Sequence, residues 1–153
     1  MKQGTDLRGL IGYQIQRAHL LMGTDARAAL APFDLSPAKF TALLMIRDNP
    51  GCDQTALGRA LSVNRSSAMK LVNILEDRGL VERRAGRDLR TNALFLRPKG
   101  EAQIGAMVKA VHQSDARMTR QLSQDEAAHL LALLGKISAE EDMADSEADT
   151  GIA

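Results

Sequence analysis

The chain has 153 residues, a formal net charge of +1 and 44% hydrophobic residues. That length fits one domain, and that composition supplies a core without staples. A single cysteine excludes a disulfide framework within the chain and any multi-cysteine metal site, so we expect a reducing, cytoplasmic compartment. No apolar run reaches the ~18 residues of a membrane span. The first residues lack the apolar stretch of an export signal, so we expect neither export nor a membrane partner.

The small net charge conceals a strong asymmetry along the chain. Between Arg47 and Lys99 there are eleven Lys or Arg against six Asp or Glu, a net charge of +5. From Ala139 onward there are six acidic residues and no basic one. The middle of the chain is therefore a candidate surface for an anionic partner, and we expect residues 144–153 to be a disordered acidic tail.

Apolar residues at three- and four-residue spacing predict one long helix from Asp6 to about Ala31, ended by Pro32. Gly9, Gly12 and Gly23 weaken this helix by about 1 kcal/mol each relative to Ala, so packing must stabilise it. A second helix begins with Ser36 as N-cap and Pro37 in the first helical position.

Two shorter helices follow a turn at Asn49-Pro50-Gly51. Asp53 caps the first of them, residues 54–61, and Asn64 caps the second, which runs to about Arg78. Gly79 is the natural residue to end that helix, because glycine adopts the left-handed conformation there at no steric cost.

The pattern then changes to that of strands. Residues 80–84 and 91–96 predict a two-stranded hairpin joined by a polar connection. Pro98 opens the next helix, and the sequence Ser123-Gln124-Asp125-Glu126 is a capping box that opens the last one. The predicted fold is mainly α with a small β-hairpin.

The two short helices are spaced to pack at a steep angle across a tight turn, as in a helix-turn-helix. The second helix has a polar face that could enter the DNA major groove and reach base edges or phosphates. The candidate DNA-binding residues on this helix are Arg65, Ser66, Ser67, Met69, Lys70 and Asn73. Any exposed helix carries such residues, so from this face alone the alternative remains that it is exposed to solvent and binds no ligand.

The hairpin that follows is rich in arginine, with Arg83, Arg84, Arg87 and Arg90 within eight positions. An arginine-rich ribbon beside a groove-reading helix suits contacts with the minor groove and the phosphates. The alternative is a solvated hairpin without a ligand.

With these features the chain resembles the MarR family of winged helix-turn-helix regulators over nearly its whole length. The resemblance is carried by segments 35–43, 54–61, 75–81 and, most specifically, by Asp88-Leu89-Arg90 followed by residues 94–100. It implies that Arg90 enters the minor groove, that Asp88 helps to hold the wing, and that the protein is an obligate homodimer. Gly58 and Ser62 depart from the family pattern, where Ala and Gly are usual.

The apolar stripes of the first and last helices also favour dimerisation. We therefore divide the chain into a helical dimerisation region (1–34 and 100–143), a winged helix-turn-helix domain (35–99) and the tail. Two-fold symmetry then places two recognition helices about one DNA turn apart, which requires a near-palindromic site.

The resemblance further implies a small effector, often an aromatic carboxylate, bound between the dimer helices and the winged domain. Polar residues that interrupt apolar stripes, with adaptable apolar neighbours, are the candidate effector-binding residues: Tyr13, Gln14, Arg17, His19, Met22, Phe40 and Arg47. Each also has an ordinary structural explanation. Cys52 has no adjacent Lys, Arg or His to lower its pKa, so we expect an inert thiol.

We therefore expect a transcriptional repressor that a small aromatic or phenolic acid releases from DNA. The alternative is a winged-helix module for protein contacts without specific DNA binding. The sequence has no nucleophile–base pair, metalloprotease motif or phosphate loop, so we expect neither an enzyme nor a cofactor or metal.

Overall fold

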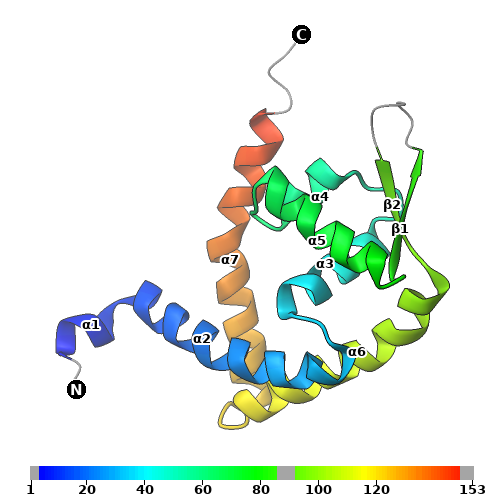
Figure 1. Ribbon diagram of the computed structural model, residues 1–153. Coiled ribbons are helices and arrows are strands. Elements are labelled where there is room, and N and C mark those ends of the chain that lie inside the picture. Colours follow the sequence, from blue (N-terminus) through cyan, green and yellow to red (C-terminus); the bar gives the residue numbers. More distant parts are fainter. Residues whose placement is uncertain (1–3, 86–91, 149–153) are drawn as a thin grey trace. The chain divides into compact units, whose positions relative to one another are not determined.

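The computed structural model describes residues 4–85 and 92–148, with side chains as far as residue 138. Figure 1 shows the elements, which follow in the order α1 (Thr5–Gly9), α2 (Ile11–Leu30), the 3₁₀ turn η1 (Ala31–Phe33), α3 (Pro37–Asp48), α4 (Gln54–Ala60), α5 (Arg65–Asp77), β1 (Val81–Ala85), β2 (Asn92–Leu96), α6 (Pro98–Met118) and α7 (Gln124–Ala148). The predicted fold class, mainly α with a β-hairpin, is confirmed.

The predicted N-terminal helix is broken, which corrects the single element expected from residue 6 to about 31. Leu10 has φ −82° and ψ 116°, an extended conformation that separates α1 from α2. Gly9 and Gly12 flank this residue, and each weakens a helix by about 1 kcal/mol relative to Ala. The predicted C-terminal end is confirmed, because α2 ends at Leu30 with Ala31 as its C-cap, and the 3₁₀ turn η1, which includes Pro32, follows and ends at Asp34.

The N-caps predicted for the central helices are confirmed. The Ser36 hydroxyl accepts from the amide of Lys39, and the Asp53 carboxylate accepts from that of Ala56 at 2.8 Å. The Asn64 side chain accepts from the amide of Ser67 at 2.9 Å. These side chains fix where α3, α4 and α5 begin.

The core lies under the helix-turn-helix and draws on most elements of the first part of the chain. The buried members are Leu30, Leu35, Phe40, Ala42, Leu43, Ile46, Leu57, Val72, Leu75, Leu80, Val81, Leu94, Ile104 and Met107. Gly100 allows α6 to pack closely on Leu80, the residue before β1, because a Cβ at position 100 would lie 2.4 Å from the carbonyl oxygen of Leu80.

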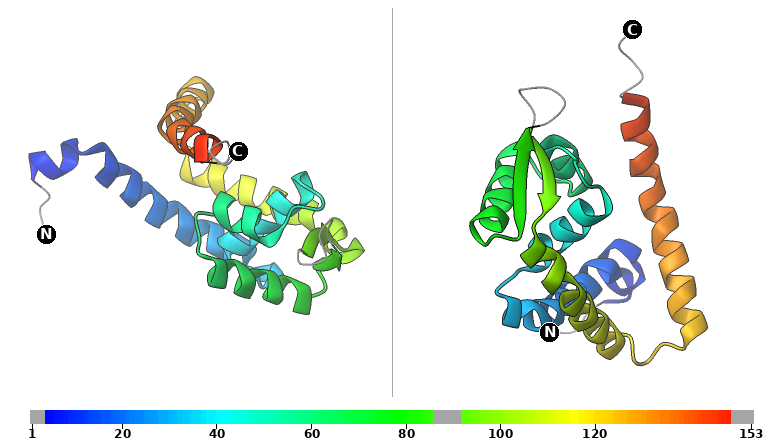
Figure 2. Two further views of the ribbon diagram at one scale, coloured as in Figure 1. Left: turned by 90° about the horizontal axis from the view of Figure 1, so that it is seen from above. Right: turned by 90° about the vertical axis from the view of Figure 1, so that its right-hand side faces the viewer.

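The hairpin pairs β1 with β2 in an antiparallel arrangement (Figure 2). In its register Arg83 stands opposite Leu94. The hairpin lies one residue further along in β1 than predicted. The segment before α4 joins it, because the amide of Gly51 donates to Leu94 and the amide of Leu94 donates to Cys52. The predicted wing residues Arg87, Asp88 and Arg90 lie outside the described residues.

The capping box at the start of α7 is confirmed. The amide of Ser123 donates to the Glu126 carboxylate at 2.8 Å, and the amide of Glu126 donates to the Ser123 hydroxyl at 3.2 Å. The backbone hydrogen bond to Ser123 also lowers the pKa of Glu126. The helix continues through Ala148, so the tail predicted from residue 144 is wrong as far as that residue. Ala144, Glu147 and Ala148 favour helix, and no Gly or Pro interrupts residues 144–148.

The chain divides into two compact units, Met1–Asp115 and Ala116–Ala153. Each carries exposed large apolar side chains. In the first unit they include Leu7, Leu10, Ile11, Ile15, Leu20 and Leu21, and in the second Leu130, Leu131, Leu133, Leu134 and Ile137. Over the described residues no single helix is long and apolar enough to cross a membrane; only Ile11–Phe33 with Pro37–Asp48 passes by length and composition, as a pair bent by 72°.

Candidate nucleic-acid interface

A tight turn sets the geometry between α4 and α5. Ser62 has φ 51°, in the left-handed region, and its amide donates to Arg59 at 2.8 Å. Gly58 lets the helices approach, because a Cβ there would lie 3.1 Å from the Cβ of Ala68. Both departures from the family pattern are therefore accommodated, with Ser62 in a conformation that glycine adopts more easily.

The second helix buries one face and exposes the other. Ala68, Val72 and Leu75 are fully buried against the core. All the helix residues predicted to contact DNA are exposed, namely Arg65, Ser66, Ser67, Met69, Lys70 and Asn73. The predicted amphipathic division of this helix is confirmed, and its outer face carries cations, hydroxyls and an amide.

Arg83 of β1 reaches both α4 and α5, which corrects its grouping with arginines that would contact DNA from the wing. Its side chain is 18% exposed and pairs with the carboxylate of Glu76. Its Nη2 also donates to Oδ1 of Asn73 at 2.6 Å and to Oε1 of Gln54 at 3.2 Å. Sequence reasoning missed this role, although Asn73 and Glu76 stand one helical turn apart and offer acceptors to one guanidinium.

The Arg83 contact also fixes how Asn73 presents its amide. A guanidinium only donates hydrogen bonds, so the Asn73 atom facing it must be the oxygen. The Nδ2 group of Asn73 is therefore left to face other partners as a donor. Such an amide suits an acceptor on a base edge or a phosphate.

Arg84 occupies an intermediate position, partly restrained and largely in solvent. Its guanidinium lies over the ring of Phe95, 4.3 Å from the ring centroid, and its Nε donates to Glu82 at 2.7 Å. The side chain is still 58% exposed. These contacts hold Arg84 along the strand and leave a cationic surface beside the start of the wing.

The predicted effector-binding residues are distributed over α2 and α3. On α2, the guanidinium of Arg17 lies 5.8 Å from the ring centroid of Tyr13, and Gln14 donates to the carbonyl of Arg8 at 2.7 Å. His19 is exposed and Met22 half-buried.

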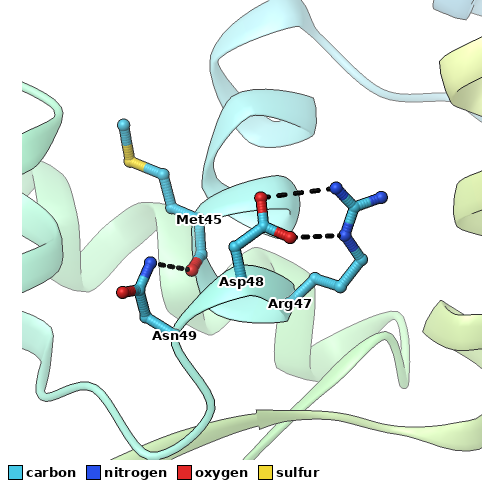
Figure 3. A network of polar contacts seen from close by, with 4 residues as sticks. All are labelled: Met45, Arg47, Asp48 and Asn49. Carbon is cyan, nitrogen blue, oxygen red and sulfur yellow. Dashed lines mark hydrogen bonds and ion pairs between the residues drawn. The ribbon is translucent and has the colours of Figure 1, made fainter.

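The two candidates on α3 have local structural roles. Phe40 is a core residue, 7% exposed. Arg47 donates to Asp48 at 2.8 Å from Nε, beside the bond from Asn49 to the carbonyl of Met45 (Figure 3). The Asp48 carboxylate raises the pKa of Arg47, and Arg47 lowers that of Asp48. A role of the α2 and α3 candidates in effector binding therefore stays a prediction.

Cavities lie elsewhere in the first unit. One of about 300 Å³ is lined by Pro32, Phe33, Asp34, Arg78, Leu80, Lys99 and Gln103. Another of about 270 Å³ is lined by Met45, Asn49, Cys52, Ala56, Leu57 and Ala60. Burial, and then the charge of Asp53, raise the pKa of Cys52, in agreement with the predicted inert thiol. Within the part of the chain that the structure describes, no group of His, Cys, Asp or Glu could hold a metal.

A capped helix, a tight turn, an amphipathic second helix and an antiparallel hairpin packed on both define a winged helix-turn-helix protein. The profile of the MarR family matches residues 33–91. A transcriptional regulatory protein for the hcr operon of Thauera aromatica is 31% identical over 133 residues, which cover 86% of this chain and 80% of the relative. The chain belongs to the MarR family of transcriptional regulators.

Solved structures of the family agree with the fold. The transcriptional repressor CouR bound to a 23-mer DNA duplex superposes with a TM-score of 0.85 at 33% identity, over 90% of this chain and 99% of CouR. CouR bound to p-coumaroyl-CoA gives 0.79 at 32% identity, over 90% and 98% of the two chains. A MarR family protein of Mycobacterium tuberculosis in complex with salicylic acid gives 0.70 at 27% identity, over 84% and 96%.

These matches establish a MarR-type transcriptional regulator, and the family is one of regulators rather than enzymes. The protein-contact module considered as an alternative is not favoured.

Proposed function

We propose that this regulator is a repressor in the cytoplasm, that it binds a near-palindromic operator as a homodimer, and that a small aromatic or phenolic acid releases it. The observation that carries the DNA-binding part is the exposed polar face of α5 beside an arginine-bearing hairpin. A helix about 10–12 Å across with its side chains fits a major groove about 12 Å wide.

Each side chain of this face has a role that its chemistry suits. Arg65 and Lys70 would contact guanine edges or phosphates, and the hydroxyls of Ser66 and Ser67 would contact bases or the backbone. Met69 would offer apolar contact to a thymine methyl group. Asn73 would donate from Nδ2. Arg84, with the wing residues Arg87, Asp88 and Arg90, would line or support the minor-groove contact.

The homodimer rests on the apolar side chains that a single chain leaves in water. They lie on α1, α2 and α7, within the regions 1–34 and 100–143 that we assign to dimerisation. Burying them against a second copy removes large apolar patches from solvent. Two recognition helices would then meet two half-sites.

The proposed effector class draws on the ligands in related structures, which are salicylic acid in one protein and p-coumaroyl-CoA in another. Both carry an aromatic ring. The exposed or half-buried polar residues of α2, Tyr13 to His19, with Met22, remain the first candidates to contact an effector across the dimer.

The experiment is a gel-shift titration of the full chain on the DNA upstream of its own gene, at several salt concentrations. We expect a specific complex that Arg65→Ala weakens by about 1–3 kcal/mol, the usual contribution of a base-edge contact. Lys109→Ala, an exposed charge on α6, is the matched control and should leave binding unchanged. Binding that ignores sequence at every salt concentration would rule out specific regulation.

A further inference from the structure

The cavity lined by Phe33, Arg78 and Lys99 collects three segments far apart in sequence: the α2–α3 connection, the residues after α5 and the first turns of α6. We propose that this cavity binds an aromatic carboxylate, whose anion takes the place of the Asp34 side chain on Arg78. The inference rests on the proposed function insofar as this ligand would be the effector, and it names the site and the charge state that the effector needs.

The central cation of this site is Arg78, which lines the cavity, while its ion-pair partner Asp34 is largely exposed to solvent. Nη2 of Arg78 contacts Oδ2 of Asp34 at 2.6 Å, and Nη1 donates to the Asp34 carbonyl. The side chain of Arg78 is 28% exposed, but that of Asp34 is 90% exposed. Exposed ion pairs contribute little to stability, so a carboxylate from solution can compete for this guanidinium.

A second cation stands beside the first. Nζ of Lys99 donates to the carbonyl oxygen of Arg78 at 2.7 Å. An ammonium group has three donors, so Lys99 keeps two for a ligand. Gln103 also lines the cavity from α6, and its amide can bond a phenol or carboxylate oxygen. An anion here would face Arg78, Lys99 and the positive end of α6 together.

The remaining wall is apolar and suits a ring. Phe33 is half-buried and Leu80 is buried, and both line the cavity with Pro32. A volume of about 300 Å³ stands at the lower end of the range of small-molecule sites. It accommodates a single-ring acid. Conversion of such an acid to a thioester removes the carboxylate that Arg78 and Lys99 would recognise.

The position of Arg78 connects this site to DNA binding. Arg78 is the C-cap residue of α5, and Asp34 ends η1 with φ 53°. Their ion pair therefore joins the end of the recognition helix to the connection that follows α2. A ligand that replaces Asp34 would break this link, and by linkage the ligand and DNA would weaken one another's binding equally.

The test is a calorimetric titration of the full chain with salicylate, and with salicylamide as the neutral analogue of equal shape. We expect salicylate to bind at least tenfold more tightly than salicylamide. Lys99→Met should weaken salicylate binding about tenfold. Asp34→Asn should strengthen it several-fold, because it removes the competing anion while Asn tolerates the left-handed backbone. Lys109→Met on α6 is the control and should change nothing, and circular dichroism checks that each variant folds.

Three outcomes would overturn the proposal. Salicylate would not bind even at millimolar concentration, salicylate and salicylamide would bind equally tightly, or Asp34→Asn would bind salicylate more weakly than the wild type. Titration of the wild-type chain on the operator without ligand separates this result from the proposed function. If the wild type binds the operator but salicylate affinity is the same in Lys99→Met and Asp34→Asn as in the wild type, only the site is wrong. If salicylate affinity changes in these variants as expected but the wild type binds no operator, the site stands and the proposed repressor fails.

Discussion

At the scale of single residues, Arg83 connects three elements, because its guanidinium joins β1 to Glu76 and Asn73 of α5 and to Gln54 of α4. We expect Arg83→Ala to lower operator affinity about tenfold, because hydrogen bonds to charged groups contribute about 1.5–3 kcal/mol and their loss frees Asn73. Arg83→Lys should lie between, because an ammonium keeps a charge for Glu76 but lacks the planar fork. Fluorescence anisotropy on a labelled operator measures both.

The salt dependence of binding distinguishes positioning from direct contact. Lys70→Ala, if Lys70 contacts a phosphate, should reduce the slope of log K against log salt by about 0.9. Arg83→Ala should leave that slope unchanged, because its partners are protein groups. A slope that falls equally in both variants would mean that Arg83 reaches DNA itself.

Cys52 gives a pH-dependent prediction at the same scale. Burial and the charge of Asp53 raise the pKa of its thiol, so the reactive thiolate forms at higher pH than in a small free thiol. The alkylation rate should therefore rise to half its maximum at a higher pH than that of N-acetylcysteine methylamide, a cysteine without a neighbouring charge. Asp53→Asn preserves the N-cap and removes the charge, so it should move this midpoint down. A midpoint below that of N-acetylcysteine methylamide would contradict the inert thiol.

At the scale of elements, the turn between α4 and α5 holds Ser62 at φ 51°. We expect Ser62→Gly to raise the free energy of unfolding by about 0.5–1 kcal/mol, since glycine adopts this conformation without a Cβ clash. Urea denaturation measures the change. Lys70→Gly, at an exposed position in the interior of α5, is the opposite control and should lower stability by about 1 kcal/mol. Destabilisation by both substitutions would show that the turn is not strained.

Local signals decided which elements could be predicted. Asp53 and Asn64 mark helix starts to within a residue, because a cap bonds an amide three positions away. The break at Leu10 was not predicted, because the cost of one glycine is small against an apolar stripe of many turns. The helix beyond residue 144 was not predicted, because this acidic stretch has no apolar period, although Ala144, Glu147 and Ala148 favour helix.

The residues of the candidate sites also differ in whether a local sequence signal reports them. The exposed face of α5 follows from its apolar period, so the exposure of its residues could be predicted. The partners of Arg83 and the lining of the cavity around Arg78 come from segments up to 71 positions apart, from Pro32 to Gln103. Such sets form only through tertiary packing, and a single sequence has no period that reports them.

For the whole molecule, the exposed apolar side chains of α1, α2 and α7 require a partner. Leu131 is 71% exposed, Ile137 59% and Ile11 70%. If a second copy covers them, sedimentation should give twice the chain mass of 16.6 kDa. The double variant Leu131→Glu, Ile137→Glu should sediment as a single chain with unchanged far-ultraviolet dichroism, because both side chains are already in solvent in one chain.

The same variant tests whether DNA binding needs two copies. When one copy of a dimer is bound to its half-site, the other copy meets the second half-site at a high effective concentration. Dissociation of the dimer into single chains should therefore lower operator affinity about 10²-fold or more. Lys136→Glu introduces the same charge on the same helix at a polar position and serves as control. A wild-type protein that sediments as one chain at micromolar concentration, or a separated variant that binds the operator as tightly as the wild type, would contradict the two-copy arrangement. The separated variant should still bind a single half-site. Its slope of log K against log salt should be about half that of the wild type, because each copy carries its own set of phosphate contacts.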